Sequence, residues 1–173
     1  MDLGTSTQLE EINLDDLQHL KAAEGYIELG MFEDADAELA AVDPSCRALP
    51  RLLTLQLCVY AGLQKWDLIQ TVAQKMAENF PDDSQWQIWW ASAARRAQSL
   101  ESAKKILLKA LETHPNDANI HYNLSCYESR LQHFRTAQRH LARAIQLDSR
   151  FQLIAMNDQD LQPLLQSLSK LEE

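Results

Sequence analysis

The amino-acid sequence predicts an all-α protein, an α-solenoid of four helix–turn–helix repeats followed by a C-terminal capping helix. Three observations predict this fold class. Apolar columns recur every 34 residues, the apolar residues within each half-repeat are spaced i, i+4 and i+7, and only four Gly and five Pro interrupt 173 residues. The length suits one domain or a short array of small units, and 46% hydrophobic residues exclude a disordered chain.

A shift of 34 residues superimposes apolar residues on apolar residues through four repeats without an insertion. Four apolar columns stay in phase over that distance, which is typical of a repeat protein. The columns are Phe32, Trp66, Leu100 and Phe134; Ala35, Ile69, Ala103 and Ala137; Leu39, Ala73, Leu107 and Leu141; and Val42, Met76, Ala110 and Ala144. Short polar breaks such as Gln132 and His133 separate two helical stripes in each repeat, so each repeat is predicted to be an antiparallel helix pair.

The boundaries between repeats follow from residues that end one helix and begin the next. Pro cannot continue a helix, and Asp, Asn and Ser cap the following one, as at Pro81 and Pro115. We therefore expect one domain with these parts: a flexible acidic segment (1–15), repeat 1 (16–49), repeat 2 (50–83), repeat 3 (84–117), repeat 4 (118–151) and a capping helix region (152–173).

The C-terminal region carries a leucine stripe that is suited to covering the open end of a repeat array. Asn157 and Asp158 are predicted to begin this last helix. The stripe consists of Leu161, Leu164, Leu165, Leu168 and Leu171. The same stripe could mediate dimerisation instead, so a monomer or a weak homodimer is expected.

A 34-residue helix pair with this pattern resembles the tetratricopeptide repeat (TPR) family over residues 16–151. The third repeat matches the family's small, large, Ala, Ala and Pro columns at Ala91, Leu100, Ala103, Ala110 and Pro115. The second repeat departs from them, with Leu57, Ile69 and Met76 where small residues are usual. The resemblance implies a right-handed superhelix whose concave groove is lined by the first helix of each repeat.

The resemblance also implies which residues line that groove, because the family uses the second, fifth, ninth, twelfth and thirteenth positions of each repeat. The candidates are Glu24, Glu28, Thr54, Cys58, Ile88, Ser92, Arg95, Arg96, Tyr122, Cys126 and Arg130, with Ile27, Arg51, Ala61, Gly62, Gln85, Asn119 and Ser129 at the remaining positions. The Lys and Asn with which chaperone-associated members grip a peptide's C-terminal carboxylate are missing, so docking of heat-shock-protein tails is not expected.

Two neighbouring tryptophans in the third repeat receive different predictions. Trp90 shares a column with Leu124 and is expected in the core. Trp89 lies about 100° further round the helix. It is a candidate groove anchor, or it packs against a neighbouring helix.

The charge distribution limits the classes of partner. A net charge of −9 argues against nucleic acid and anionic membranes. Residues 1–50 hold 12 of the 25 acidic residues and 2 of the 16 basic ones, so the later repeats are mildly basic. We therefore expect a bound protein or peptide to place its acidic part near Arg95, Arg96 and Arg130.

No motif for catalysis, cofactor binding or metal binding is present in the sequence. The five His and three Cys form no HExxH or CxxC pattern, and there is no GxSxG elbow or phosphate-binding Gly loop. We therefore expect no enzyme activity, no cofactor and no metal. The odd number of cysteines, the acidic N-terminus and the absence of a long apolar run predict a cytoplasmic protein without membrane insertion.

Together these features predict a non-catalytic protein–protein interaction module, an adaptor or scaffold that binds a peptide or partner segment in its groove. A dedicated secretion-type chaperone and an accessory subunit of a larger enzyme complex remain alternatives, because the sequence does not separate them from an adaptor.

Overall fold

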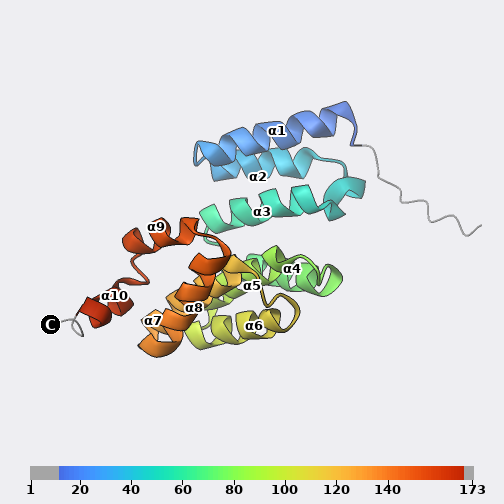
Figure 1. Cartoon of the computed structure of the whole chain (residues 1–173). Helices are drawn as coiled ribbons and strands as arrows, with labels where there is room; N and C mark the ends of the chain where they lie inside the picture. Colours follow the sequence, from blue (N-terminus) through green and yellow to red (C-terminus); the bar gives the residue numbers. More distant parts are fainter. Residues whose placement is uncertain (1–11, 170–173) are drawn as a thin grey trace, which may run out of the picture. The chain divides into compact units, whose positions relative to one another are not determined.

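A computed structural model describes residues 12–169 of the chain and shows an all-α fold over that range (Figure 1). The predicted fold class is confirmed. The helices are α1 (Leu14–Glu28), α2 (Phe32–Ala41), the 3-10 helix η1 (Pro44–Ala48), α3 (Pro50–Gly62), α4 (Trp66–Asn79), α5 (Ser84–Ala97), α6 (Leu100–Thr113), α7 (Ala118–Arg130), α8 (Phe134–Leu147), α9 (Arg150–Asn157) and α10 (Gln162–Ser169).

The 34-residue period reappears in the backbone. Helices α2, α4, α6 and α8 begin at Phe32, Trp66, Leu100 and Phe134, which are the members of one predicted column. The turn before each of them is closed by an amide that bonds to the carbonyl five residues back, as the helix-ending Schellman motif requires. These bonds run from Met31 to Tyr26, Lys65 to Tyr60, Ser99 to Ala94 and His133 to Glu128, at 2.8–3.1 Å. Three of these turns are full Schellman motifs, since Gly30, Gln64 and Gln132 have φ of 71°, 57° and 63°. In the turn before α6, Gln98 has φ −126°, so that turn shares the hydrogen bond but not the left-handed residue.

The chain divides into two compact units, Met1–Lys65 and Trp66–Glu173. The division falls inside the second predicted repeat, because α3 belongs to the first unit and α4 to the second. This is the repeat that departs most from the family's small-residue columns. The one-domain arrangement of the sequence prediction stays a prediction.

In the first unit α1 packs against α2 and α3. Leu20, Leu39 and Leu52 are at most 2% exposed and form its core. A buried carboxylate joins the helix ends, since Asp16 Oδ1 accepts a 2.9 Å hydrogen bond from the Asp43 amide. Helix α1 begins two residues earlier than predicted because the Asn13 side chain caps it by accepting from the Asp16 amide. Residues 1–11 of the predicted flexible segment lie outside the described residues.

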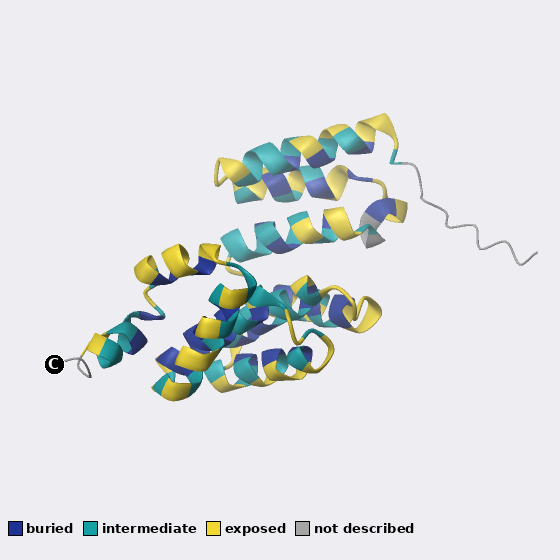
Figure 2. Ribbon diagram, viewed as in Figure 1, coloured by how far each residue is buried: buried dark blue, intermediate teal, exposed yellow. Residues whose placement is uncertain are grey.

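In the second unit each helix from α4 to α8 packs against the next one in sequence. Figure 2 shows buried residues along the faces that these helices turn toward one another. The predicted columns account for much of this core, which includes Ala103, Leu107, Ala137, Leu141 and Ala144. At these positions of the third and fourth repeats, the residues that the helical period predicts to be buried are therefore the ones that are buried.

The C-terminal region forms two short helices where one was predicted. Helix α9 continues from the fourth repeat and α10 begins at Gln162, five residues after Asn157. Leu161 and Leu164 have no exposed surface and join the core of the second unit, as expected of a cap. Leu171 lies outside the described residues.

Candidate binding groove

The first helices of the third and fourth repeats, α5 and α7, carry side chains that hold residues 158–164 of the same chain. We call the residues concerned (Arg95, Tyr122, Cys126, Ser129 and Arg130) the groove residues, and residues 158–169 the tail segment. The resemblance to the TPR family implied concave-face positions for all five. It did not show that the chain itself supplies their partner.

Two arginines hold the carboxylate of Asp160. Arg95 donates from both terminal nitrogens, at 2.5 and 2.8 Å, in the two-bond geometry that a guanidinium makes with a carboxylate. Arg130 Nε lies 3.8 Å from the same carboxylate. The bond to Asp160 raises the pKa of Arg95 above its ordinary value, so this side chain stays charged. The arrangement is a binding site for one negative charge.

A second carboxylate, that of Asp158, is held by Tyr122 and Cys126. The Tyr122 hydroxyl donates to Asp158 Oδ2 at 2.6 Å, and the Cys126 thiol lies 3.6 Å from the same oxygen. Burial, reinforced by this carboxylate, raises the pKa of both Tyr122 and Cys126 above their ordinary values. Both groups therefore stay protonated and can act as donors. The Tyr122 ring also stacks on Phe151 of α9, with 4.5 Å between centroids.

The tail segment is anchored beyond its two carboxylates as well. The Leu164 amide donates to the Ser129 hydroxyl at 3.3 Å. Helix α10 packs against α7 and α8, which buries Leu161 and Leu164. The groove residues thus bind a short polypeptide through charge, hydrogen bonds and an apolar contact.

The other candidates in the second unit lie outside this group. The guanidinium of Arg96 lies over the ring of Trp66 of α4, 4.4 Å from its centroid, instead of beside Arg95. Ile88 packs against the core, and Trp89 and Ser92 are half-buried. Within residues 12–169, none of these four side chains forms a hydrogen bond or ion pair with the tail segment.

The candidates in the first unit form a separate polar surface. Arg51 at the start of α3 pairs with Glu24 of α1 at 2.8 Å, and both side chains are largely exposed. Thr54 and Glu28 are exposed, while Cys58 is half-buried, and that burial raises the pKa of its thiol. An exposed ion pair of this kind contributes about 0–1 kcal/mol to stability.

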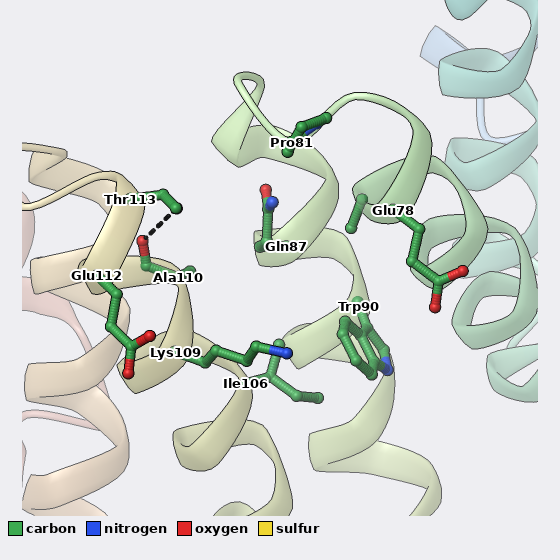
Figure 3. Close-up of a pocket in the computed structure, with 10 residues that line it drawn as sticks. Glu78, Pro81, Gln87, Trp90, Ile106, Lys109, Ala110, Glu112 and Thr113 are labelled. Carbon is green, nitrogen blue, oxygen red and sulfur yellow. Dashed lines mark hydrogen bonds between the residues drawn. The ribbon is translucent and has the colours of Figure 1, made fainter.

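A pocket of about 300 Å³ lies between α4, α5 and α6, away from the predicted groove positions (Figure 3). Trp90 forms one wall and is half-buried, so its predicted place in the core is wrong. Figure 3 shows the Lys109 side chain extending toward this ring. Residues of three helices line the pocket, so no single sequence motif could indicate it.

The titratable groups outside the groove make structural contacts. Glu128 is almost fully buried and is paired with Lys104 at 3.2 Å and His133 at 2.7 Å. His121 and His140 bring their Nδ1 atoms within 3.0 Å. Among residues 12–169 no group of three or more His, Cys, Asp or Glu side chains could hold a metal ion. Over the same range no helix is long and apolar enough to cross a bilayer.

Comparison with known proteins shows the fold. No protein-family profile and no curated protein sequence matches the chain. Among solved structures, MamA 41-end from Desulfovibrio magneticus RS-1 is 14% identical with a TM-score of 0.65, and the match covers 93% of this chain and 95% of that one. MamA MSR-1 is 22% identical with a TM-score of 0.58, over 79% and 78% of the two chains. YrrB, described as a TPR protein with an unusual peptide-binding site, is 17% identical with a TM-score of 0.59, over 83% and 75%. The chain therefore has the TPR fold.

Proposed function

We propose that this protein is a non-catalytic interaction module that binds an acidic segment of a partner protein with the groove residues of α5 and α7. The observation that carries the proposal is the tail segment itself, because side chains at family groove positions already bind two carboxylates and a backbone amide. The peptide-binding site ascribed to YrrB, which has the same fold, supports it.

The electrostatics of the groove support an acidic partner segment. The acidic excess of the chain lies in residues 1–50, whereas the later repeats, which carry the groove residues, are mildly basic and do not repel an acidic segment. Arg95 and Arg130 supply local positive charge beside the Tyr122 hydroxyl, which favours carboxylates at that place. Charge would guide the partner into position, and apolar contacts would supply most of its affinity.

The test replaces the two arginines and measures partner capture. We expect Arg95→Ser with Arg130→Ser to lower the abundance of specifically captured proteins by about tenfold, because partly exposed charge-assisted contacts with a carboxylate are lost. The measurement is quantitative mass spectrometry after affinity capture from cells of the source organism.

A matched control removes the same charge elsewhere. Arg135 and Arg139 are exposed residues of α8, so Arg135→Ser with Arg139→Ser changes net charge equally without touching the groove. This variant should capture the same proteins as the wild type. Equal capture by the groove variant, with helical content unchanged by circular dichroism, would contradict the proposal.

A further inference from the structure

The tail segment contacts the groove residues as a peptide ligand would. Its first carboxylate meets a phenol, its second meets a guanidinium pair, and its two leucines are fully buried. The backbone amide of Asp160 also donates to Asp158 Oδ1 at 2.8 Å, a local turn that fixes the spacing of the two acids. The recognised pattern is therefore Asp-x-Asp-Leu-x-x-Leu.

We infer that the groove residues form a receptor for partner segments with this pattern, and that the tail segment is an internal ligand which such a partner displaces. The inference rests on the proposed function and adds the chemistry of the partner. Each feature of the pattern has its own contact: Asp158 with Tyr122, Asp160 with the arginines, and Leu161 and Leu164 with the core of the second unit.

The contact with Asp160 selects for a charged carboxylate. The two parallel bonds from Arg95 need two acceptor oxygens on one planar group. An amide offers one acceptor oxygen and places a donor NH₂ against a cation. Replacing Asp by Asn in the bound segment should therefore weaken binding strongly while changing its shape little.

Displacement is physically feasible because the tail segment is short and partly solvated. Helix α10 has eight residues, below the length at which an isolated helix is stable in water. The Arg95 and Asp160 side chains are 33% and 20% exposed, so water reaches the ion pair. Such a terminal element opens at a lower free energy than the helices of the core.

Tethering gives the tail segment an advantage that a partner must overcome. A segment attached by a short linker acts at an effective concentration on the order of millimolar. The apparent affinity for a partner is reduced by the fraction of time the groove is open. Weakening the internal ligand should therefore increase binding from solution.

The experiment uses the full chain and a labelled peptide of residues 156–169. The receptor carries Asp158→Asn and Asp160→Asn, which weaken the internal ligand and leave the groove residues intact. By fluorescence anisotropy we expect the peptide to bind this receptor at least about tenfold more tightly than it binds the wild type. Adding Arg95→Ser to the receptor, or placing Asn at both acidic positions of the peptide, should abolish the gain.

A matched control neutralises two acids away from the groove. Glu101 and Glu112 are exposed residues of α6, so Glu101→Gln with Glu112→Gln should bind the peptide no better than the wild type. Equal binding to the wild type and the Asp158/Asp160 variant, or equal binding of the Asn peptide, would overturn the inference. The capture experiment with the arginine variant tests the proposed function independently of this result.

A second measurement needs no substitution. In native-state hydrogen exchange of the wild type, the amides of α10 should exchange at least about tenfold faster than those of α7. If α10 exchanges as slowly as α7, the tail segment leaves the groove only on global unfolding, and it is a fixed cap instead of an exchangeable ligand.

Discussion

Gly25 and Gly62 are both helical residues of the first unit, but their surroundings differ. A Cβ atom added to Gly25 in α1 would meet nothing within 4 Å. A Cβ added to Gly62, at the end of α3, would overlap the ring of Phe32. Gly62 is thus required by the close approach of an aromatic side chain, and Gly25 is not required by its surroundings.

Paired substitutions test this difference. Gly62→Ala should destabilise the protein by about 1–3 kcal/mol, because the Phe32 ring must move. Gly25→Ala should stabilise it by about 0.5–1 kcal/mol through helix propensity. Urea unfolding followed by far-ultraviolet circular dichroism measures both, and a Gly62→Ala protein as stable as Gly25→Ala would refute the packing argument.

The contributions of His19 and His140 to stability should change in opposite directions as the pH rises. The hydrogen bond to Glu38, 2.7 Å away, holds the pKa of His19 above its ordinary value of 6.5. Its contribution to stability is therefore full below pH 6.5 and lost as pH rises through the folded pKa. Burial and the neighbouring His121 hold the pKa of His140 below 6.5, so its contribution is present above pH 6.5 and lost as pH falls. NMR titration of the ring protons should place the two pKa values on opposite sides of 6.5 in the folded protein. If the two pKa values differ in the same way in the urea-unfolded chain, the folded-state contacts are not the cause.

The success of single-residue predictions depended on whether a side chain's place is set by its own helix or by contacts with other helices. The resemblance to the TPR family implied that Arg95, Tyr122 and Arg130 lie on one face of the repeats, and these three side chains contact the tail segment. Arg96 is the neighbour of Arg95 on α5, but its guanidinium lies over the ring of Trp66. Trp90, also on α5, lines a pocket. Neither contact could be read from spacing, since each depends on side chains from another helix.

At the scale of elements, α9 and α10 differ in what they bury. Leu164 of α10 has no exposed surface, whereas Leu153 of α9 is 70% exposed. Helix α10 therefore covers the core of the second unit, while α9 buries Phe151 and Ala155 and leaves Leu153 in water.

Leucine truncations measure this division of roles. Leu164→Ala should cost about 2–5 kcal/mol, since it leaves a cavity in the core. Leu153→Ala should change stability by less than about 0.5 kcal/mol. Thermal unfolding of the two variants gives the comparison, and similar costs would show that α10 is not a cap.

Helix starts were more predictable than the course of the C-terminal region. The second helix of every repeat begins at a predicted column because the 34-residue period keeps these helix starts in register, although the turn before α6 has two residues and the others have three. The last helix begins later than Asn157 because Asp158 and Asp160 bond to Tyr122 and Arg95. Asn157 and Asp158 suggested a helix start from local capping rules, but Asp158 caps only a local turn with the Asp160 amide and also binds Tyr122.

For the whole molecule, the tryptophans offer a selective probe. All four (Trp66, Trp86, Trp89 and Trp90) lie in the second unit, on α4 and α5. Tryptophan fluorescence therefore reports the second unit, whereas far-ultraviolet circular dichroism reports helices of both.

Repeat proteins can lose cooperativity between neighbouring parts, and we expect this at the division within the second repeat. Leu52→Ala removes a fully buried side chain of the first unit and should destabilise that unit by about 2–5 kcal/mol. The circular dichroism transition should then begin at lower urea while the fluorescence midpoint stays unchanged. An equal shift of both signals would show that the units unfold as one.

The hydrogen bond that recurs in all four turns makes chain length itself a structural constraint. Each turn joins its helices through a backbone hydrogen bond that spans a fixed number of residues, whatever side chains lie between. One inserted residue would advance the next helix by about 100° and carry its apolar column away from the core. The turns should therefore tolerate a change of side chain more readily than a change of length, except at Gly30, Gln64 and Gln132, where the left-handed backbone disfavours β-branched residues and proline.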